Sequence, residues 1–164
     1  MFSYKRASVE DIPLLIENRV RLLKLANNLK NISDWSSMKK ELYHYYICSI
    51  PSNNHIAYLA YKESVFVGTG GICFYHVLPT YHNPTGRKAY ITNMYTLPEF
   101  RNQGVASCIL NYLIEESLDL GVKFISLEAT ESARKIYKKI GFTPLYTEMQ
   151  LKNETYDMNQ NKIH

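Results

Sequence analysis

The stretch Arg101-Asn102-Gln103-Gly104-Val105-Ala106 lies between two runs of different character, and this arrangement predicts the fold around it. The run before it, Ala89 to Leu97, is apolar and β-prone, and Pro98 ends it. The run after it, Val105 to Leu120, repeats apolar residues at helical spacing. The sequence therefore predicts a strand, a short loop and a helix that opens at small residues.

The start of this predicted helix is suited to an anion. The first N–H groups of a helix have no partners within the helix, and the helix start carries partial positive charge. Gly104 and Ala106 have little or no side chain, so an anion can come close to these N–H groups. We therefore expect the loop and the first helical turn to bind a pyrophosphate.

Length and composition indicate one globular domain. The chain has 164 residues, 46% of them apolar or aromatic, which is enough for one hydrophobic core. We expect a single domain over residues 1–152 and a polar, loosely ordered tail over residues 153–164. No apolar run approaches the roughly 20 residues that span a bilayer, and the first residues do not resemble a signal peptide.

Charge and cysteine usage narrow the class further. The formal net charge of +4 is mild, and no block of five like charges indicates an arm that binds nucleic acid. The three cysteines, Cys48, Cys73 and Cys108, form no CxxC pair, which is typical of reduced thiols. We therefore predict a cytoplasmic protein that binds neither nucleic acid nor a membrane.

The remaining patterns predict an α/β (α+β) fold with a mixed sheet of six to seven strands and helices on both faces. The cluster Gly68-Thr69-Gly70-Gly71 within a strand indicates a bulge or a close backbone approach. A strand, a helix and a strand over residues 89–127 fit a right-handed parallel crossover. The expected strands cover residues 2–7, 55–61, 65–77, 89–97, 122–127 and 142–151, and the expected helices begin near Ser8 or Asp11, Ser33, Val105, and Thr130 or Ser132.

A second motif lies on the last predicted helix. Taken alone, Tyr137 would be interpreted as a packed aromatic residue. The pattern Arg101-x-x-Gly104-x-Ala106, followed by Ala133-x-x-x-Tyr137-x-x-x-Gly141-Phe142, resembles the GNAT superfamily of acetyl-CoA-dependent N-acetyltransferases. The resemblance covers residues 89–151, and the N-terminal half agrees in element order only.

The resemblance implies a GNAT-like domain with a splayed central sheet and with acetyl-CoA as cosubstrate. It implies that Tyr137 protonates the departing thiolate. Thr130, where many members carry Asn, is expected to bind the pantetheine arm. The strand residues expected to pair with that arm are Met94, Tyr95 and Thr96. The residues expected to bind the pyrophosphate are Arg101, Asn102, Gln103, Gly104, Val105, Ala106 and Ser107.

The resemblance also implies direct attack of an amine on the thioester within a ternary complex. Glu128 is our first hypothesis for the general base, with Glu10, Glu41 and Glu148 as alternatives, and Asn93 is a candidate for orienting a water. Such folds build the acceptor pocket from the first two helices and the loop after the long hairpin strand, and aromatic side chains there suit an apolar or cationic ligand. The residues in question are Trp35, Tyr75, His76, Tyr81 and His82. His76 and His82 have no third ligand at metal spacing, so we expect no metal.

The predicted function is therefore N-acetylation of a small-molecule or peptide amine. A GNAT-fold sensor that binds acetyl-CoA without turnover is the alternative. A homodimer formed through an exposed final strand is a further hypothesis. A hydrolase and a Rossmann domain are disfavoured, because neither Gly-x-Ser-x-Gly nor Gly-x-Gly-x-x-Gly is present.

Overall fold

The computed structural model describes residues 1–26 and 33–150. These residues form two compact units, one over Met1–Glu128 and a second that starts at Ala129, and each is described by itself. The tail expected over residues 153–164 lies outside the described residues, and the single domain expected over residues 1–152 stays a prediction.

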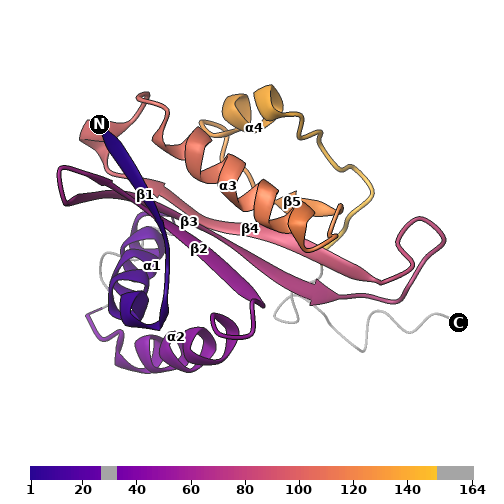
Figure 1. The fold of residues 1–164 in the computed structure, drawn as a ribbon, viewed down its shortest axis with the longest axis horizontal. Helices are drawn as coiled ribbons and strands as arrows, with labels where there is room; N and C mark the ends of the chain where they lie inside the picture. Colours follow the sequence, from indigo (N-terminus) through magenta and orange to yellow (C-terminus); the bar gives the residue numbers. More distant parts are fainter. Residues whose placement is uncertain (27–32, 151–164) are drawn as a thin grey trace, which may run out of the picture. The chain divides into compact units, whose positions relative to one another are not determined.

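The first unit is built on one mixed sheet (Figure 1). Its strands lie in the order β1-β2-β3-β4-β5, antiparallel except for the parallel pair β4–β5. The strands are β1 (Phe2–Arg6), β2 (His55–Lys62), β3 (Val65–His76), β4 (Arg87–Thr96) and β5 (Ile125–Leu127).

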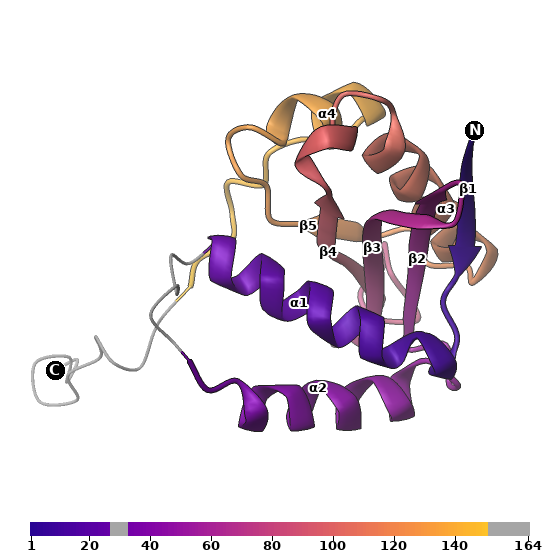
Figure 2. The same cartoon turned by 90° about the vertical axis from the view of Figure 1, so that its left-hand side faces the viewer.

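Helices cover both faces of this sheet, as expected. Figure 2 shows α1 (Ile12–Ala26) and α2 (Ser36–Ser49) on one side of the sheet and α3 (Val105–Asp119) on the other. The short helix α4 (Arg134–Ile140) belongs to the second unit. Two 3-10 turns, η1 (Val9–Asp11) and η2 (Pro98–Phe100), lead into α1 and out of β4.

Short polar contacts fix where the helices begin and end. The N–H of Ser8 donates to Oδ2 of Asp11 at 2.8 Å, and the N–H of Ser36 donates to Oδ1 of Asp34 at 2.9 Å. Both bonds satisfy N–H groups that a helix start leaves free. Gly121 takes a left-handed φ of 72° just after α3, the usual conformation for ending a helix.

The strand alternation divides the core into two layers. Ala57 and Leu59 of β2 are buried in the cluster that also contains Leu15 of α1 and Leu42 of α2. Tyr58, between them, lies on the opposite face, where its ring stacks on Tyr112 of α3 at 4.9 Å. Because side chains alternate along β2, one set packs against α1 and α2 and the other packs against α3.

The glycine cluster of β3 shows both features that the sequence indicates as alternatives, a bulge and a close backbone approach. The β3–β4 register shifts between Thr69 and Gly71, so that Gly70 lies opposite both Asn93 and Met94 in a β-bulge, and Asn93 has a φ of 57°. A Cβ on Gly68 would lie 2.8 Å from the carbonyl oxygen of Tyr95, so the backbones of β3 and β4 approach closely there. The prediction of a bulge and of a close approach is therefore confirmed.

The expected count of six to seven strands is not confirmed, because the described residues form five. Residues 142–150, predicted to be a strand, have no strand structure. Pro144 has no N–H to donate to a ladder, and the adjacent Leu145 and Tyr146 are exposed, so pairing there would bury little apolar surface.

Two predicted elements are shorter than expected. Residues 122–124 do not join β5, because Val122 bonds back to the end of α3: its N–H donates to the carbonyl of Ser117 at 2.8 Å and its carbonyl accepts from Oγ of Ser117 at 2.8 Å. The last helix begins at Arg134, since the residues before it form a turn in which the N–H of Ala133 donates to the carbonyl of Thr130.

Candidate active site

The β4–β5 ladder is short and leaves an edge of β4 free. It joins Ala89 to Ile125 and ends where Ile91 pairs with Leu127. Beyond Ile91, β4 is paired with β3 alone among the described residues, with Tyr95 opposite Thr69. The predicted arm-binding residues Met94, Tyr95 and Thr96 all lie on this one-sided stretch. Unpaired strand backbone offers N–H and C=O groups to an extended ligand.

The loop that follows β4 turns sharply into α3. Asn102 and Gly104 have left-handed φ values of 60° and 85°. Among the described residues, the N–H groups of residues 102–107 have no hydrogen-bond partner, and the first helical bond runs from Cys108 to the carbonyl of Gly104 at 3.0 Å. A Cβ on Gly104 would meet nothing within 4 Å, so this start of the helix is open. The arrangement is suited to phosphate oxygens.

Two side chains of the loop bind the backbone of the residues before it, at the end of β4 and in η2. Nε of Arg101 donates to the carbonyl of Thr96 at 3.2 Å, and Nε2 of Gln103 donates to the carbonyl of Glu99 at 3.0 Å. These bonds order the loop through the backbone while its own N–H groups stay free. The structure therefore brings the predicted pyrophosphate-binding residues and the strand residues Met94, Tyr95 and Thr96 together at one end of β4.

Tyr137 lies on α4 in the second unit and is 8% exposed. Its ring packs edge-on against Phe142 at 6.0 Å, and Gly141, with a φ of 115°, lets the chain turn back for this contact. Burial raises the pKa of Tyr137, so its hydroxyl is protonated at neutral pH. Thr130, earlier in the same unit, has its Oγ1 3.2 Å from Oγ of Ser132.

The first candidate base, Glu128, follows β5 directly and lies beside Tyr90 of β4. The pKa of Tyr90 is raised first by burial and then by the charge of Glu128. Glu10 and Glu41 are exposed, on η1 and α2, and Glu148 lies in the second unit. Of these carboxylates, Glu128 is the one beside the free stretch of β4.

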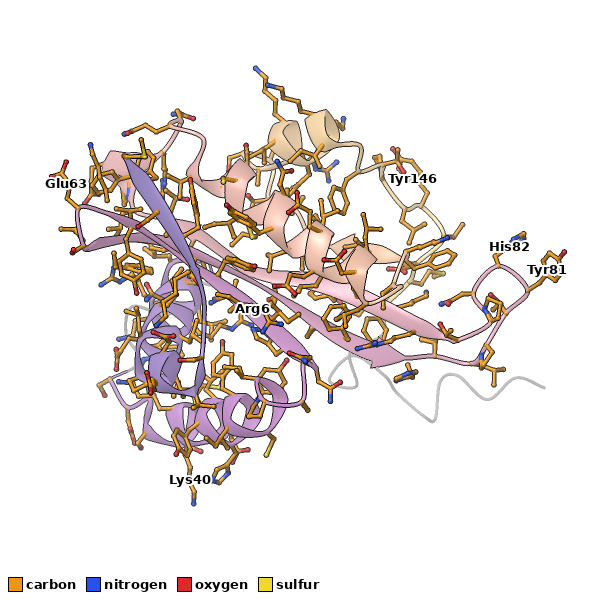
Figure 3. All side chains as sticks on the ribbon, in the orientation of Figure 1. Arg6, Lys40, Glu63, Tyr81, His82 and Tyr146 are labelled. Carbon is orange, nitrogen blue, oxygen red and sulfur yellow. The ribbon has the colours of Figure 1, made fainter. Side chains whose placement is uncertain are left out.

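The five predicted acceptor residues are not brought together. Trp35 packs against the core between the sheet and α1 and α2, with Nζ of Lys24 5.4 Å from its ring centre. Tyr81 and His82 lie at the tip of the β3–β4 hairpin and point away from the sheet (Figure 3). Tyr75 and His76, at the end of β3, are also exposed.

A cavity of about 190 Å³ lies instead between β4 and the helices α1 and α2. Its polar lining comes from residues that the sequence reasoning missed, apart from Asn93, which it singled out only for orienting a water. The strand positions in this lining depend on the sheet register and the bulge, which local patterns do not reveal. The lining is Leu42 together with Arg19, Tyr45, Tyr46, His55, Thr92 and Asn93.

The lining combines apolar surface with a few polar side chains, and it contains no carboxylate. His55 is 3% exposed, and burial, followed by the charge of Arg19, lowers its pKa to about 4. The hydroxyl of Tyr45 lies 3.1 Å from Nδ1 of His55. Burial raises the pKa of Tyr46 to about 12, and the charge of Arg19 opposes this rise. At neutral pH the imidazole and both phenols are therefore uncharged.

The described residues contain neither a candidate metal site nor a candidate membrane span. Within it, no group of three or more His, Cys, Asp or Glu side chains could hold a metal ion. No helix in residues 1–26 or 33–150 combines the length and the apolar character needed to cross a bilayer.

Comparison with known proteins identifies the family. The model described as "Acetyltransferase (GNAT) family" matches residues 24–142. The chain is 34% identical to a predicted acetyltransferase from Clostridium acetobutylicum whose crystal structure contains acetyl-CoA, with 93% of this chain and 96% of that chain covered and a TM-score of 0.82. The chain belongs to the GNAT family, whose members use acetyl-CoA as cosubstrate.

Two further relatives extend the comparison. The chain is 33% identical over 83 residues to thialysine N-ε-acetyltransferase from Sus scrofa, a match that covers 49% of this chain and 46% of that protein, or less than half its length. A GCN5-related N-acetyltransferase from Ralstonia eutropha JMP134 shares the fold at 19% identity, with a TM-score of 0.79 and coverage of 93% of this chain and 98% of that chain.

Proposed function

We propose that this protein transfers the acetyl group of acetyl-CoA to a primary amine of a small molecule or peptide, by direct attack in a ternary complex. The observation that carries the proposal is the open start of α3, with its free N–H groups, directly after the one-sided stretch of β4. The named activity of the Sus scrofa relative and the acetyl-CoA in the Clostridium acetobutylicum structure agree with it.

The residues present fit the coenzyme. The loop that ends in Gly104 leaves space where a Cβ would meet no atom, and N–H groups that need an acceptor line that space. The free edge of β4 over Met94–Thr96 suits the amides of a pantetheine arm. When bound, acetyl-CoA supplies an activated acetyl thioester, and the backbone N–H groups near Tyr95 are our candidates for stabilising charge that develops on its oxygen.

The amine must lose a proton before it attacks. An alkylamine with a pKa near 10.4 is about 1 part in 2,500 neutral at pH 7, which corresponds to a cost of about 4.6 kcal/mol. We propose that Glu128 accepts this proton, directly or through a water that Asn93 orients. Glu128 has a suitable place for this role beside Tyr90, next to the free stretch of β4.

The thiolate must leave protonated, and we propose Tyr137 as the donor. A phenol near pKa 10 is already a weaker acid than a thiol near 8.5, and burial raises the pKa of Tyr137 further. Proton transfer ahead of bond breaking is therefore unfavourable. The hydroxyl of Tyr137 must donate as the carbon–sulfur bond breaks.

The test combines coenzyme binding with turnover. The protein is heated with and without coenzyme A to measure thermal stabilisation, and thiol release from acetyl-CoA is followed with a panel of alkylamines, amino acids and peptides. We expect stabilisation and amine-dependent thiol release. Stabilisation without release for any amine would favour a non-catalytic acetyl-CoA sensor, and the absence of both would refute the proposal.

A further inference from the structure

The cavity between β4 and the helices α1 and α2 contains one positive charge that no described residue balances. Arg19 of α1 lines the cavity and is half-buried. Among the described residues it forms no ion pair and no hydrogen bond, whereas Arg6 and Arg134 pair with Glu116 and Glu131. A partly buried charge without a partner is costly, and an anion that enters the cavity would lower this cost.

The charge of Arg19 reaches the interior of the cavity. It contributes to the lowered pKa of His55 on β2, after burial, and it opposes the raised pKa of Tyr46 on α2. His55 and the two tyrosines are uncharged at neutral pH, so Arg19 is the one charged side chain in the lining. The electrostatic preference of the cavity is therefore for a negative group.

A second polar group in the same cavity lacks a partner. Asn93 is 7% exposed, and its Oδ1 is buried without a hydrogen-bond partner among the described residues. Its left-handed φ of 57° places it in the β4 bulge, two residues beyond Ile91, where the β4–β5 ladder ends. An amide oxygen in this position is an acceptor for the N–H of an amine. The cavity thus offers a cation for one ligand group and an acceptor for another.

The volume limits what fits. About 190 Å³ corresponds to roughly six water molecules, and it is below the usual range of roughly 300–1,000 Å³ for pockets that enclose drug-sized ligands. A short chain that carries an amine and a carboxylate fits this volume. A larger acceptor would have to extend out of the cavity.

We propose that this cavity selects an acceptor amine that also carries a carboxylate, with Arg19 binding the carboxylate and Asn93 accepting a hydrogen bond from the amine. The proposal rests on the proposed acetyl transfer and names its substrate class. It replaces the aromatic residues of the β3–β4 hairpin with Arg19 as the residue that determines specificity.

The test uses matched pairs of amines that differ only in the acid group. β-Alanine is compared with β-alanine amide, and lysine with cadaverine, and kcat/KM is measured for each in the presence of acetyl-CoA. In Arg19→Met we expect the acid-to-neutral ratio of kcat/KM to fall by at least about 10-fold, the lower end of what a charge-assisted hydrogen bond contributes. Comparing this ratio between Arg19→Met and the wild type cancels the intrinsic reactivity of each amine.

Two further variants separate recognition from folding. Arg21→Met removes an exposed arginine that lies two positions along the same helix and faces away, and we expect it to leave the ratio within about twofold. Arg19→Lys keeps the charge and should keep part of the preference. If the wild type accepts acids and neutral amines alike, or if Arg19→Met lowers kcat/KM equally for both, the proposal is wrong.

Binding is measured separately, so that failure of the substrate class and failure of acetyl transfer can be told apart. Calorimetry with β-alanine and its amide in the presence of coenzyme A tests the cavity without turnover, and we expect tighter binding of the acid in the wild type than in Arg19→Met. Turnover without a preference for acids would overturn the inference and leave acetyl transfer in place. A binding preference without turnover would support the cavity and overturn the activity.

Discussion

Substitutions at Gly104 and Gly121 can distinguish an effect on coenzyme binding from an effect of backbone strain. They flank the same helix, α3, and have left-handed φ values of 85° and 72°. A Cβ on either would meet nothing within 4 Å. Gly104→Ala and Gly121→Ala therefore introduce similar strain at opposite ends of α3, and the Cβ at position 104 alone enters the space where we place the pyrophosphate.

The strain is expected to be nearly equal in the two variants. A side chain in the left-handed region costs about 1–2 kcal/mol. In a chain of 164 residues, each kcal/mol shifts Tm by about 2–4 °C, so both variants should melt about 2–8 °C below the wild type without ligand. Neither substitution creates a steric clash that would add to this difference.

The ligand effect should differ. Coenzyme A at about 100 times its Kd adds about 2.7 kcal/mol to the wild type, or about 5–11 °C in Tm. Loss of one charge-assisted hydrogen bond to phosphate weakens binding by about 10- to 150-fold. At 100-fold weaker binding the same coenzyme concentration equals the new Kd and adds only about 0.4 kcal/mol, or about 1–2 °C.

The assay is differential scanning fluorimetry of the three proteins over a coenzyme A titration. We expect Gly121→Ala to keep the full ligand-induced shift from its lowered starting Tm, and Gly104→Ala to lose most of it. A full shift in Gly104→Ala would mean that the phosphates do not contact the start of α3.

Three other results are expected. Tyr137→Phe should lower kcat by about 10-fold or more and leave the coenzyme-induced Tm shift intact, whereas Tyr146→Phe, at an exposed tyrosine of the same unit, should change neither; equal kcat values in Tyr137→Phe and wild type would remove Tyr137 from acid catalysis. Glu128→Gln should lower kcat by about 100-fold at neutral pH, and a loss under about threefold would assign the proton to another acceptor. The pKa of His55 is lowered from 6.5 to about 4, so its contribution to stability is present above pH 6.5 and is lost as the pH falls toward 4. Between these pH values, the free energy of unfolding measured in urea should fall by about 3 kcal/mol more in the wild type and in His44→Gln than in His55→Gln (2.5 pH units at about 1.36 kcal/mol each). Parallel curves for all three proteins would contradict the burial argument.

The parts of the fold that depend on local patterns could be predicted from the sequence. The loop around Gly104 and the helix after it follow from residues close together in the chain, and the structure confirms them. The turn at Glu63 and Ser64, with φ values of 49° and 69°, joins the predicted hairpin strands β2 and β3. In each case the signal comes from residues that are neighbours in the chain, within the reach of local propensity.

The cavity that we propose for the acceptor could not be predicted in this way. Arg19, His55 and Asn93 meet only through the sheet register and the bulge opposite Gly70, which join segments far apart in sequence. The one local signal was Asn93 itself, a polar residue within an apolar strand. Residue type alone also does not show whether Tyr81 packs or projects, and in the structure it is exposed at the tip of the β3–β4 hairpin.

Gly68 of β3 limits how the candidate coenzyme site can change in evolution. A Cβ on Gly68 would lie 2.8 Å from the carbonyl oxygen of Tyr95 and 3.3 Å from Cγ1 of Val105, the first residue of α3. Even the smallest side chain there would press on the end of β4 and on the first residue of α3, which together form the candidate phosphate cradle. Gly68 is therefore expected to tolerate no substitution, although it need not contact a ligand itself. The first expected effect of replacing it is a loss of coenzyme affinity.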